Sequence, residues 1–164
     1  LNDEFPLSFL PEVYGFGEVE STGDRKIRLF LGHWFDGYNE FHVSRDPSDK
    51  KNKILVWDDR RIRFYLSLEQ SADLYRQAAR ILTYYDNVES FEQIFSWHHG
   101  AGDFVVKINN ADLDLNLISV RGYAPIFKNS GQMENGEGDV ELILQALLIF
   151  FLNLSVRMRL DRYD

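Results

Sequence analysis

The stretch DFVVKINNADLDLNLISV, residues 103–120, decides the fold of this chain. Each half alternates apolar with polar residues, which is the pattern of a strand buried on one face. Between the halves stands Asn109-Asn110-Ala111-Asp112, and asparagine and aspartate favour turns and tolerate left-handed backbone. The stretch therefore predicts a β-hairpin. Its core face is expected to carry Phe104, Val106, Ile108, Leu113, Leu115 and Leu117.

Two upstream stretches alternate in the same way and predict half-buried strands. Their apolar residues are Ile27, Leu29 and Leu31 in one, and Ile62, Phe64 and Leu66 in the other. A helix follows directly, because Ser67 and Gln70 have the spacing of a capping box, in which serine and glutamine each bond the other's backbone amide. Apolar residues at spacings of three and four predict that this helix runs to about Tyr85.

Two more helices are expected beyond it. Ser90 and Gln93 repeat the capping-box spacing and predict a second, short helix. A third is expected from about Asp139 to Arg162, acidic in its first turn and basic in its last, as the helix dipole favours. Its middle is apolar nearly all round, which predicts a central buried helix. The order of elements gives an α+β fold, in a single domain over residues 1–164.

Composition excludes several classes of function. The chain has 164 residues, 45% hydrophobic and 27% charged, the proportions of one soluble domain. It has no cysteine, which excludes disulfides, iron–sulfur clusters and thiol catalysis. The formal net charge of −8 has the wrong sign for binding phosphate backbones, so we expect no nucleic-acid partner.

The expected location is the cytoplasm, and no membrane partner is predicted. The missing cysteines and the lack of an export signal in this sequence favour the cytoplasm. The apolar run over residues 142–152 has about half the length that a bilayer span requires. Because the sequence begins with Leu1 rather than methionine, we expect it to be a processed protein or part of a longer chain. Nothing in the sequence specifies the oligomeric state.

Candidate chemistry concentrates in WHHGAGD, residues 97–103, where two imidazoles, two glycines and a carboxylate precede a strand. Histidine exchanges protons near neutral pH, and glycine lets the backbone approach a ligand closely. In the competing structural interpretation, Trp97 and one histidine fill the core while the glycines only turn the chain. A metal site is a further hypothesis, with His33, Glu40 and His42 joining His98 and His99, although the spacing fits no metal signature.

Read in order, the elements resemble the second lobe, with the preceding strands and hinge, of the kinase-like fold in aminoglycoside phosphotransferases and choline kinases. The resemblance rests on PEVYGFGE at residues 11–18, RLFLGHWFDG at 28–37 and HGAGDFVV at 99–106. It implies a hinge beside an adenine site, which places Trp34, Phe35 and Asp36 there, with ATP and magnesium as cofactors. It places Ser119 and Arg121 beyond the catalytic-like loop, on the same pocket.

The departures from this family predict lost or reduced phosphoryl transfer. The position of the catalytic aspartate holds Ala101, and that of the magnesium-binding asparagine holds Asp103. Ser119 follows Leu117-Ile118 where the family has its second magnesium aspartate. If activity remains, Asp103 is the expected cation ligand and His99 the expected proton acceptor.

Three functions are therefore open. The first is a degenerate kinase-like protein, a phosphotransferase if active, with a small-molecule or nucleotide pocket between hinge and loop. The second is a non-catalytic module that presents aromatic residues to a protein partner, with Trp34, Tyr38, Phe41 and Trp57 as candidates. The third is a histidine–carboxylate metalloenzyme.

Overall fold

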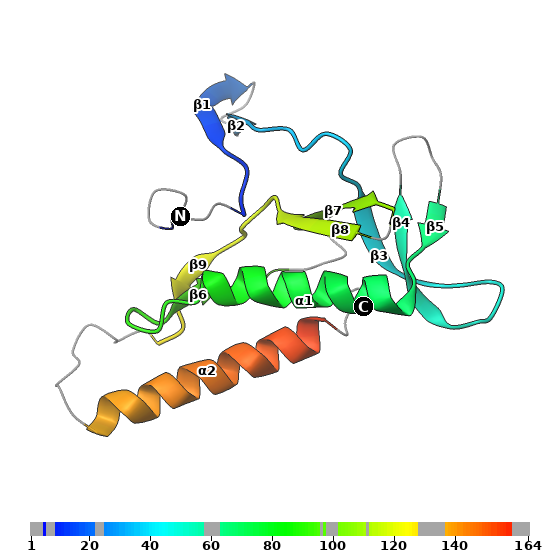
Figure 1. The fold of residues 1–164 in the computed structure, drawn as a ribbon. Helices are drawn as coiled ribbons and strands as arrows, with labels where there is room; N and C mark the ends of the chain where they lie inside the picture. The colour runs from blue at the N-terminus through cyan, green and yellow to red at the C-terminus, as the bar shows by residue number, and fades with distance from the viewer. Residues whose placement is uncertain are drawn as a thin grey trace.

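The chain forms an α+β fold, as predicted (Figure 1). The computed structural model describes residues 5, 9–21, 25–57, 63–95, 97, 102–110, 112–127 and 137–158. The strands are β1 (Val13–Ser21), β2 (Arg25–Gly32), β3 (Glu40–Arg45), β4 (Asn52–Trp57), β5 (Arg63–Tyr65), β6 (Glu92–Ile94), β7 (Phe104–Asn109), β8 (Asp112–Leu117) and β9 (Tyr123–Pro125). The helices are α1 (Leu68–Tyr84) and α2 (Glu137–Arg157).

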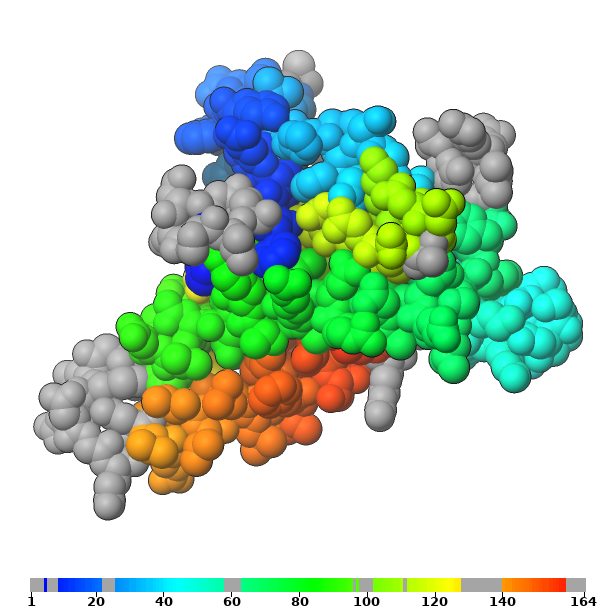
Figure 2. All heavy atoms as spheres, in the orientation of Figure 1, coloured from blue at the N-terminus to red at the C-terminus, as the bar shows by residue number. Residues whose placement is uncertain are grey.

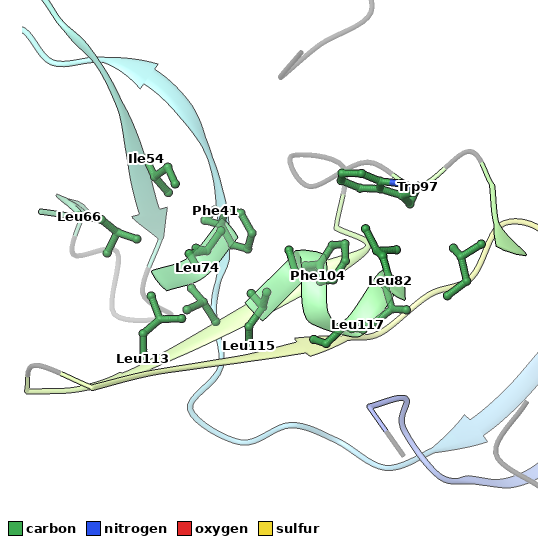
Figure 3. Packing of buried hydrophobic residues seen from close by; sticks show 14 of the residues in the cluster. Phe41, Ile54, Leu66, Leu74, Leu82, Trp97, Phe104, Leu113, Leu115 and Leu117 are labelled. Atoms are coloured by element: carbon green, nitrogen blue, oxygen red, sulfur yellow. The ribbon is translucent and has the colours of Figure 1, made fainter. Parts of the chain in front are cut away.

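The β7–β8 hairpin lies at the centre and confirms the prediction. Its antiparallel register runs from Phe104 opposite Leu117 to Asn109 opposite Asp112. Asn110 in the turn has a φ of 59°, the left-handed region that asparagine tolerates. The apolar face of the hairpin packs on α1, and Figure 3 shows Phe104, Leu115 and Leu117 against the helix side chains.

Helix α1 confirms the predicted cap and the predicted end near Tyr85. The Ser67 hydroxyl accepts from the Gln70 amide at 3.1 Å, and the Gln70 side chain accepts from the Ser67 amide at 3.0 Å. Leu74, Ala78, Ile81 and Leu82 are buried on the face that meets the hairpin. The sheet β3–β4–β5 closes one end of this core and the pair β6–β9 the other (Figure 1).

The prediction of a second, short helix is wrong. Residues 92–94 form strand β6, which pairs antiparallel with β9, Gln93 standing opposite Ala124. Phe91 has a φ of 58°, which is incompatible with a right-handed helix, and its ring is buried against Phe127 at 5.3 Å. A long-range strand partner overrides the local capping signal here.

The prediction that the strand with Ile27, Leu29 and Leu31 is half-buried is also wrong. In β2 all three side chains are exposed, because β2 pairs only with β1 among the described strands. This β1–β2 ribbon stands apart from the other strands at the top of Figure 1.

Helix α2 is peripheral, which corrects the expectation of a central buried helix. It lies along the outside of α1, and over the window Val140–Arg157 only 17% of residues are buried. Ala146 and Phe150 reach the core, whereas the opposite face is exposed. By length and composition alone α2 is also a candidate membrane span.

Candidate functional site

The segment that the resemblance assigns to the hinge is fastened to strand β7. Asn39 and Val106 exchange two backbone hydrogen bonds, of 2.8 and 2.9 Å. The Lys107 ammonium donates to the carbonyl of Asp36 at 3.1 Å. Between these ties Gly37 turns the chain with a φ of 75°, and a Cβ there would lie 3.3 Å from Lys107 Nζ. The segment is therefore held in one position relative to the central hairpin.

A cavity of about 460 Å³ opens between this segment and the hairpin. Aromatic side chains line one side of it. The ring centres of His33 and Phe35 are 5.2 Å apart in an edge-to-face arrangement, and those of Phe35 and Tyr38 are 5.3 Å apart with the rings tilted. Val105 and Ile118 line it from the hairpin. The remaining lining residues are Pro11, Phe30, Leu31, Gly32, Trp34 and Glu40.

Tyr38 is fixed at the edge of this cavity. Its hydroxyl donates to the carboxylate of Asp114, and Lys107 Nζ lies 5.6 Å from its ring centre. Burial, followed by the hydrogen bond and charge of Asp114, raises the pKa of Tyr38 to about 12. Tyr38 is therefore neutral at physiological pH, and it presents an oriented ring rather than an acid or base.

Three of the sequence-predicted residues meet at the base of the hairpin. Asp103 precedes β7, and Ser119 and Arg121 follow β8, so the hairpin register brings them together. The Ser119 hydroxyl and Arg121 Nε both donate to Asp103 Oδ1, at 2.7 and 3.0 Å. The Ile118 amide donates to the Asp103 carbonyl at 2.8 Å. Asp103 is 1% exposed, so this carboxylate is enclosed.

Glu40 links the two groups of residues. It lines the cavity, and a Cβ on Gly102, next to Asp103, would lie 3.6 Å from Glu40 Oε1. Val105 and Ile118 neighbour the Asp103 group along the hairpin. The structure thus brings Trp34 and Phe35 to the cavity and sets Ser119, Arg121 and Asp103 beside it. Asp36, by contrast, does not line the cavity, and its carbonyl accepts a hydrogen bond from Lys107.

Sequence reasoning missed the hairpin side of this cavity. Val105 falls on the face that alternation assigns to solvent, yet it is 8% exposed. An apolar residue on the polar face of an alternating strand signals that something covers it. Here the cover is the segment that holds Tyr38.

The enclosed Asp103 does not fit Mg²⁺. Magnesium requires near-octahedral oxygen ligands. Asp103 Oδ1 already accepts two hydrogen bonds, one from Ser119 and one from Arg121. The positive charge of the Arg121 guanidinium would repel a Mg²⁺ ion bound to the same carboxylate. Asp103 is therefore arranged as a positioning group, rather than as the cation ligand that the resemblance implies.

The candidate histidines lie apart in the described ranges. His33 Nδ1 is 3.2 Å from the Tyr14 hydroxyl, and the His42 ring lies 4.5 Å from that of Trp57. Among the residues that the structure describes, no three of His, Asp and Glu are grouped to hold a metal ion. His98 and His99 lie outside those residues, so a role for His99 as proton acceptor stays a prediction.

A larger cavity, of about 600 Å³, lies between the β3–β4 region and α1. Its polar lining includes Lys53, which is bound to Asp46 at 2.7 Å and to Asp49 at 2.8 Å. None of the residues proposed from the sequence lines it. We therefore place the candidate site in the aromatic cavity.

Comparison with protein-family models, curated proteins and solved structures gives no match.

Proposed function

We propose that this chain is a kinase-like protein without phosphoryl transfer, which binds a small, uncharged planar molecule such as a nucleoside in the aromatic cavity. The observation that carries the proposal is the cavity itself. Trp34, Phe35 and Tyr38 line it from one side, and Val105 and Ile118 from the other. Rings and apolar side chains around a few polar groups are the usual composition of a small-molecule site.

The charges around the cavity favour a neutral ligand over a nucleotide. Glu40 lines the cavity. Asp114 accepts a hydrogen bond from the lining residue Tyr38, and Asp103 is bonded to Ser119, which follows the lining residue Ile118. The nearby ammonium of Lys107 is directed to the Asp36 carbonyl. A triphosphate placed here would meet carboxylates with no lysine or arginine among the described lining residues, whereas a neutral ring system would only stack.

The arrangement of Asp103 supports loss of phosphoryl transfer. That reaction depends on metal ions and lysine to neutralise the transferred group. Asp103 is neutralised by Arg121 instead, and the family's catalytic position holds Ala101. Asp103, Ser119 and Arg121 then act to fix the hairpin base beside the ligand.

The test is titration calorimetry of the full chain with adenosine, with ATP and with ATP plus Mg²⁺. We expect adenosine to bind, and Trp34→Ala to weaken it at least tenfold, about 1.4 kcal/mol, because an exposed ring at the rim is lost. Trp57→Ala is the matched control, since Trp57 packs on His42 away from the cavity, and it should leave binding unchanged. Binding of ATP only with Mg²⁺ would contradict the neutral ligand, and no binding of any of the three would contradict the proposal.

A protein-interaction module is the second candidate, favoured by the β1–β2 ribbon. Phe16 is 91% exposed and Phe30 72%, and clustered exposed apolar residues mark interaction surfaces. Phe41, by contrast, is buried in the core and is not available to a partner. Hydroxyl-radical labelling of Phe16 in intact cells and in the purified protein distinguishes the cases. Weaker labelling in cells supports a bound partner, and equal labelling contradicts it.

A further inference from the structure

Helix α2 has two apolar faces, and only one of them packs on the chain. Phe150 and Leu154 lie on the inner face, toward the core, and Ala146 is buried. The outer face (Figure 2, along the lower margin) carries seven apolar side chains that are 39% to 61% exposed. They are Val140, Leu144, Leu148, Ile149, Phe151, Leu152 and Val156. Five of the seven recur every fourth residue, which makes one continuous ridge along the helix.

This outer face has the size of half an interface. About half of seven large side chains amounts to on the order of 600 Å², close to the ~800 Å² that each partner contributes to a standard interface. This area also lies at the upper end of the range for the largest exposed apolar patch on a typical monomer. No charged residue occurs from Leu142 to Val156, so no ionic group would lose its hydration on burial.

We propose that this outer face of α2 joins two copies of the chain, the two helices packing antiparallel about a two-fold axis at Leu148. The face is self-complementary in that orientation, as a two-fold interface requires. Leu148 then meets itself, and Leu144 meets Leu152 of the second copy.

The charges at the ends of α2 support the antiparallel orientation. The N-terminal turns carry acidic residues up to Glu141, whereas Arg157, which ends the helix, is turned to the inner face, where its guanidinium donates to the Trp97 carbonyl at 3.0 Å. Antiparallel packing keeps the acidic ends of the two copies apart, and it also opposes the two helix dipoles. Parallel packing would bring the two acidic ends together.

The same observations disfavour a lipid surface as the occupant. Glu141, Gln145 and Ser155 are exposed beside the apolar ridge, and interfacial helices instead carry a strongly basic polar face. The chain's net charge of −8 would also be repelled by anionic headgroups. Phe150 belongs to the core cluster and Leu154 packs against it, which attaches the helix along its inner face.

The first test is the mass of the full chain in solution, by sedimentation equilibrium over a range of concentrations. We expect twice the 19.2 kDa of one chain. Leu148→Glu places two like charges at the axis and should halve that mass, with an unchanged circular dichroism spectrum. Leu68→Glu is the matched control, since Leu68 is an exposed leucine on α1, and it should remain dimeric. A monomeric wild type, or a dimeric Leu148→Glu variant, would overturn the proposal.

The second test fixes the orientation, and it uses the absence of cysteine from the chain. A mixture of Leu144→Cys and Leu152→Cys chains should give an oxidised heterodimer, because these positions face each other across the axis. Neither variant alone should cross-link, since its two thiols would lie on opposite sides of the axis, about 12 Å apart along the helices. Cross-linking of each variant with itself would show parallel packing and overturn the proposal.

A third measurement separates the remaining occupants. Wild-type chain that floats with phosphatidylcholine–phosphatidylglycerol vesicles, while Leu148→Glu does not, would assign the face to lipid and overturn the dimer. Absence of flotation supports it. Adenosine binding is measured separately. Helix α2 lies on the other side of α1 from the β7–β8 hairpin (Figure 1), and no residue of α2 lines the aromatic cavity, so failure of one proposal leaves the other standing.

Discussion

Gln77 shows how one side chain can attach a helix to a strand edge. Its amide nitrogen donates to the Leu113 carbonyl at 2.6 Å, and its amide oxygen accepts from the Leu115 amide at 3.0 Å. These are backbone groups of β8 that a neighbouring strand would otherwise satisfy. The α1–hairpin contact is therefore polar as well as apolar, which the spacing of apolar residues could not reveal.

Replacing Gln77 by methionine should destabilise the fold. The volume is nearly conserved, but two half-buried backbone groups lose their partners, which costs roughly 2–3 kcal/mol. Urea unfolding measures the loss. Arg80→Met on the same helix is the control and should change stability by less than about 0.5 kcal/mol, because Arg80 is exposed. A similar effect of both variants would contradict the role of the Gln77 amide.

Gln93 should respond in the opposite direction. Its side chain is fully buried, and neither amide atom has a hydrogen-bond partner among the described residues. Gln93→Met removes an unsatisfied polar group at similar volume and should stabilise the protein by about 1 kcal/mol. Thermal unfolding checks it, with Gln93→Glu as the contrasting variant that should destabilise strongly. Destabilisation by Gln93→Met would instead reveal a partner for its amide.

At the scale of elements, the same sequence signal has two outcomes. Ser67 and Gln70 form a complete capping box and begin α1, whereas Ser90 and Gln93 have the same spacing and no helix follows. Asn87 accepts from the Ser90 amide at 3.1 Å and shapes a turn, after which β6 pairs with β9. A local motif predicts a helix only where no distant strand competes for the backbone, and the sequence gives no sign of that competitor.

Hydrophobic patterns predicted which faces need cover, but they did not predict what covers them. The β7–β8 hairpin and α1 were predictable because each supplies the cover of the other. Strand β2 and helix α2 carry equally clear apolar patterns, yet each leaves an apolar face exposed in this structure. Both expectations of burial were wrong for that reason, and an exposed apolar face of this kind is typical of an interaction surface.

The β3–β4 connection should make stability depend on pH. Asp46 accepts from Lys53 at 2.7 Å and from the amide and hydroxyl of Ser48. The bond from Lys53, and then those from Ser48, lower the pKa of Asp46 from 3.8 to about 2. Because the folded pKa is depressed, the stabilisation is complete above pH about 4 and is lost as pH falls toward 2.

Asp46→Asn should therefore reduce the free energy of unfolding at pH 7. Its difference from wild type should shrink between pH 4 and pH 2, where the wild-type carboxylate is itself protonated. Urea unfolding at a series of pH values measures the difference. A difference that stays constant across this interval would show that the charge of Asp46 is not what holds the turn.

At the scale of the whole molecule, one central unit supports two peripheral elements. The hairpin and α1 enclose the core, and they position both Asp103 and the aromatic cavity. The candidate site could be predicted from sequence only in part. Trp34, Phe35, Asp103, Ser119 and Arg121 were singled out by resemblance, but the pairing of Asp103 with Arg121 depends on hairpin register and side-chain direction, which no short motif encodes.

Helix α2 should detach while this central unit stays folded. Among its described side chains, Ala146 and Phe150 are the buried ones, and few buried contacts imply a low free energy of local opening. Phe150→Ala removes the largest of these contacts, a change that costs about 3–5 kcal/mol in a well-packed site. Amide hydrogen exchange, measured in the Leu148→Glu background to keep the chain monomeric, should accelerate at least tenfold in α2 and stay unchanged in α1.

Phe151→Ala is the matched control, because Phe151 is 55% exposed on the outer face, and it should leave the exchange rates of both helices unchanged. Equal acceleration in α1 and α2 would mean that the chain opens as one cooperative unit, with α2 an integral part of the core.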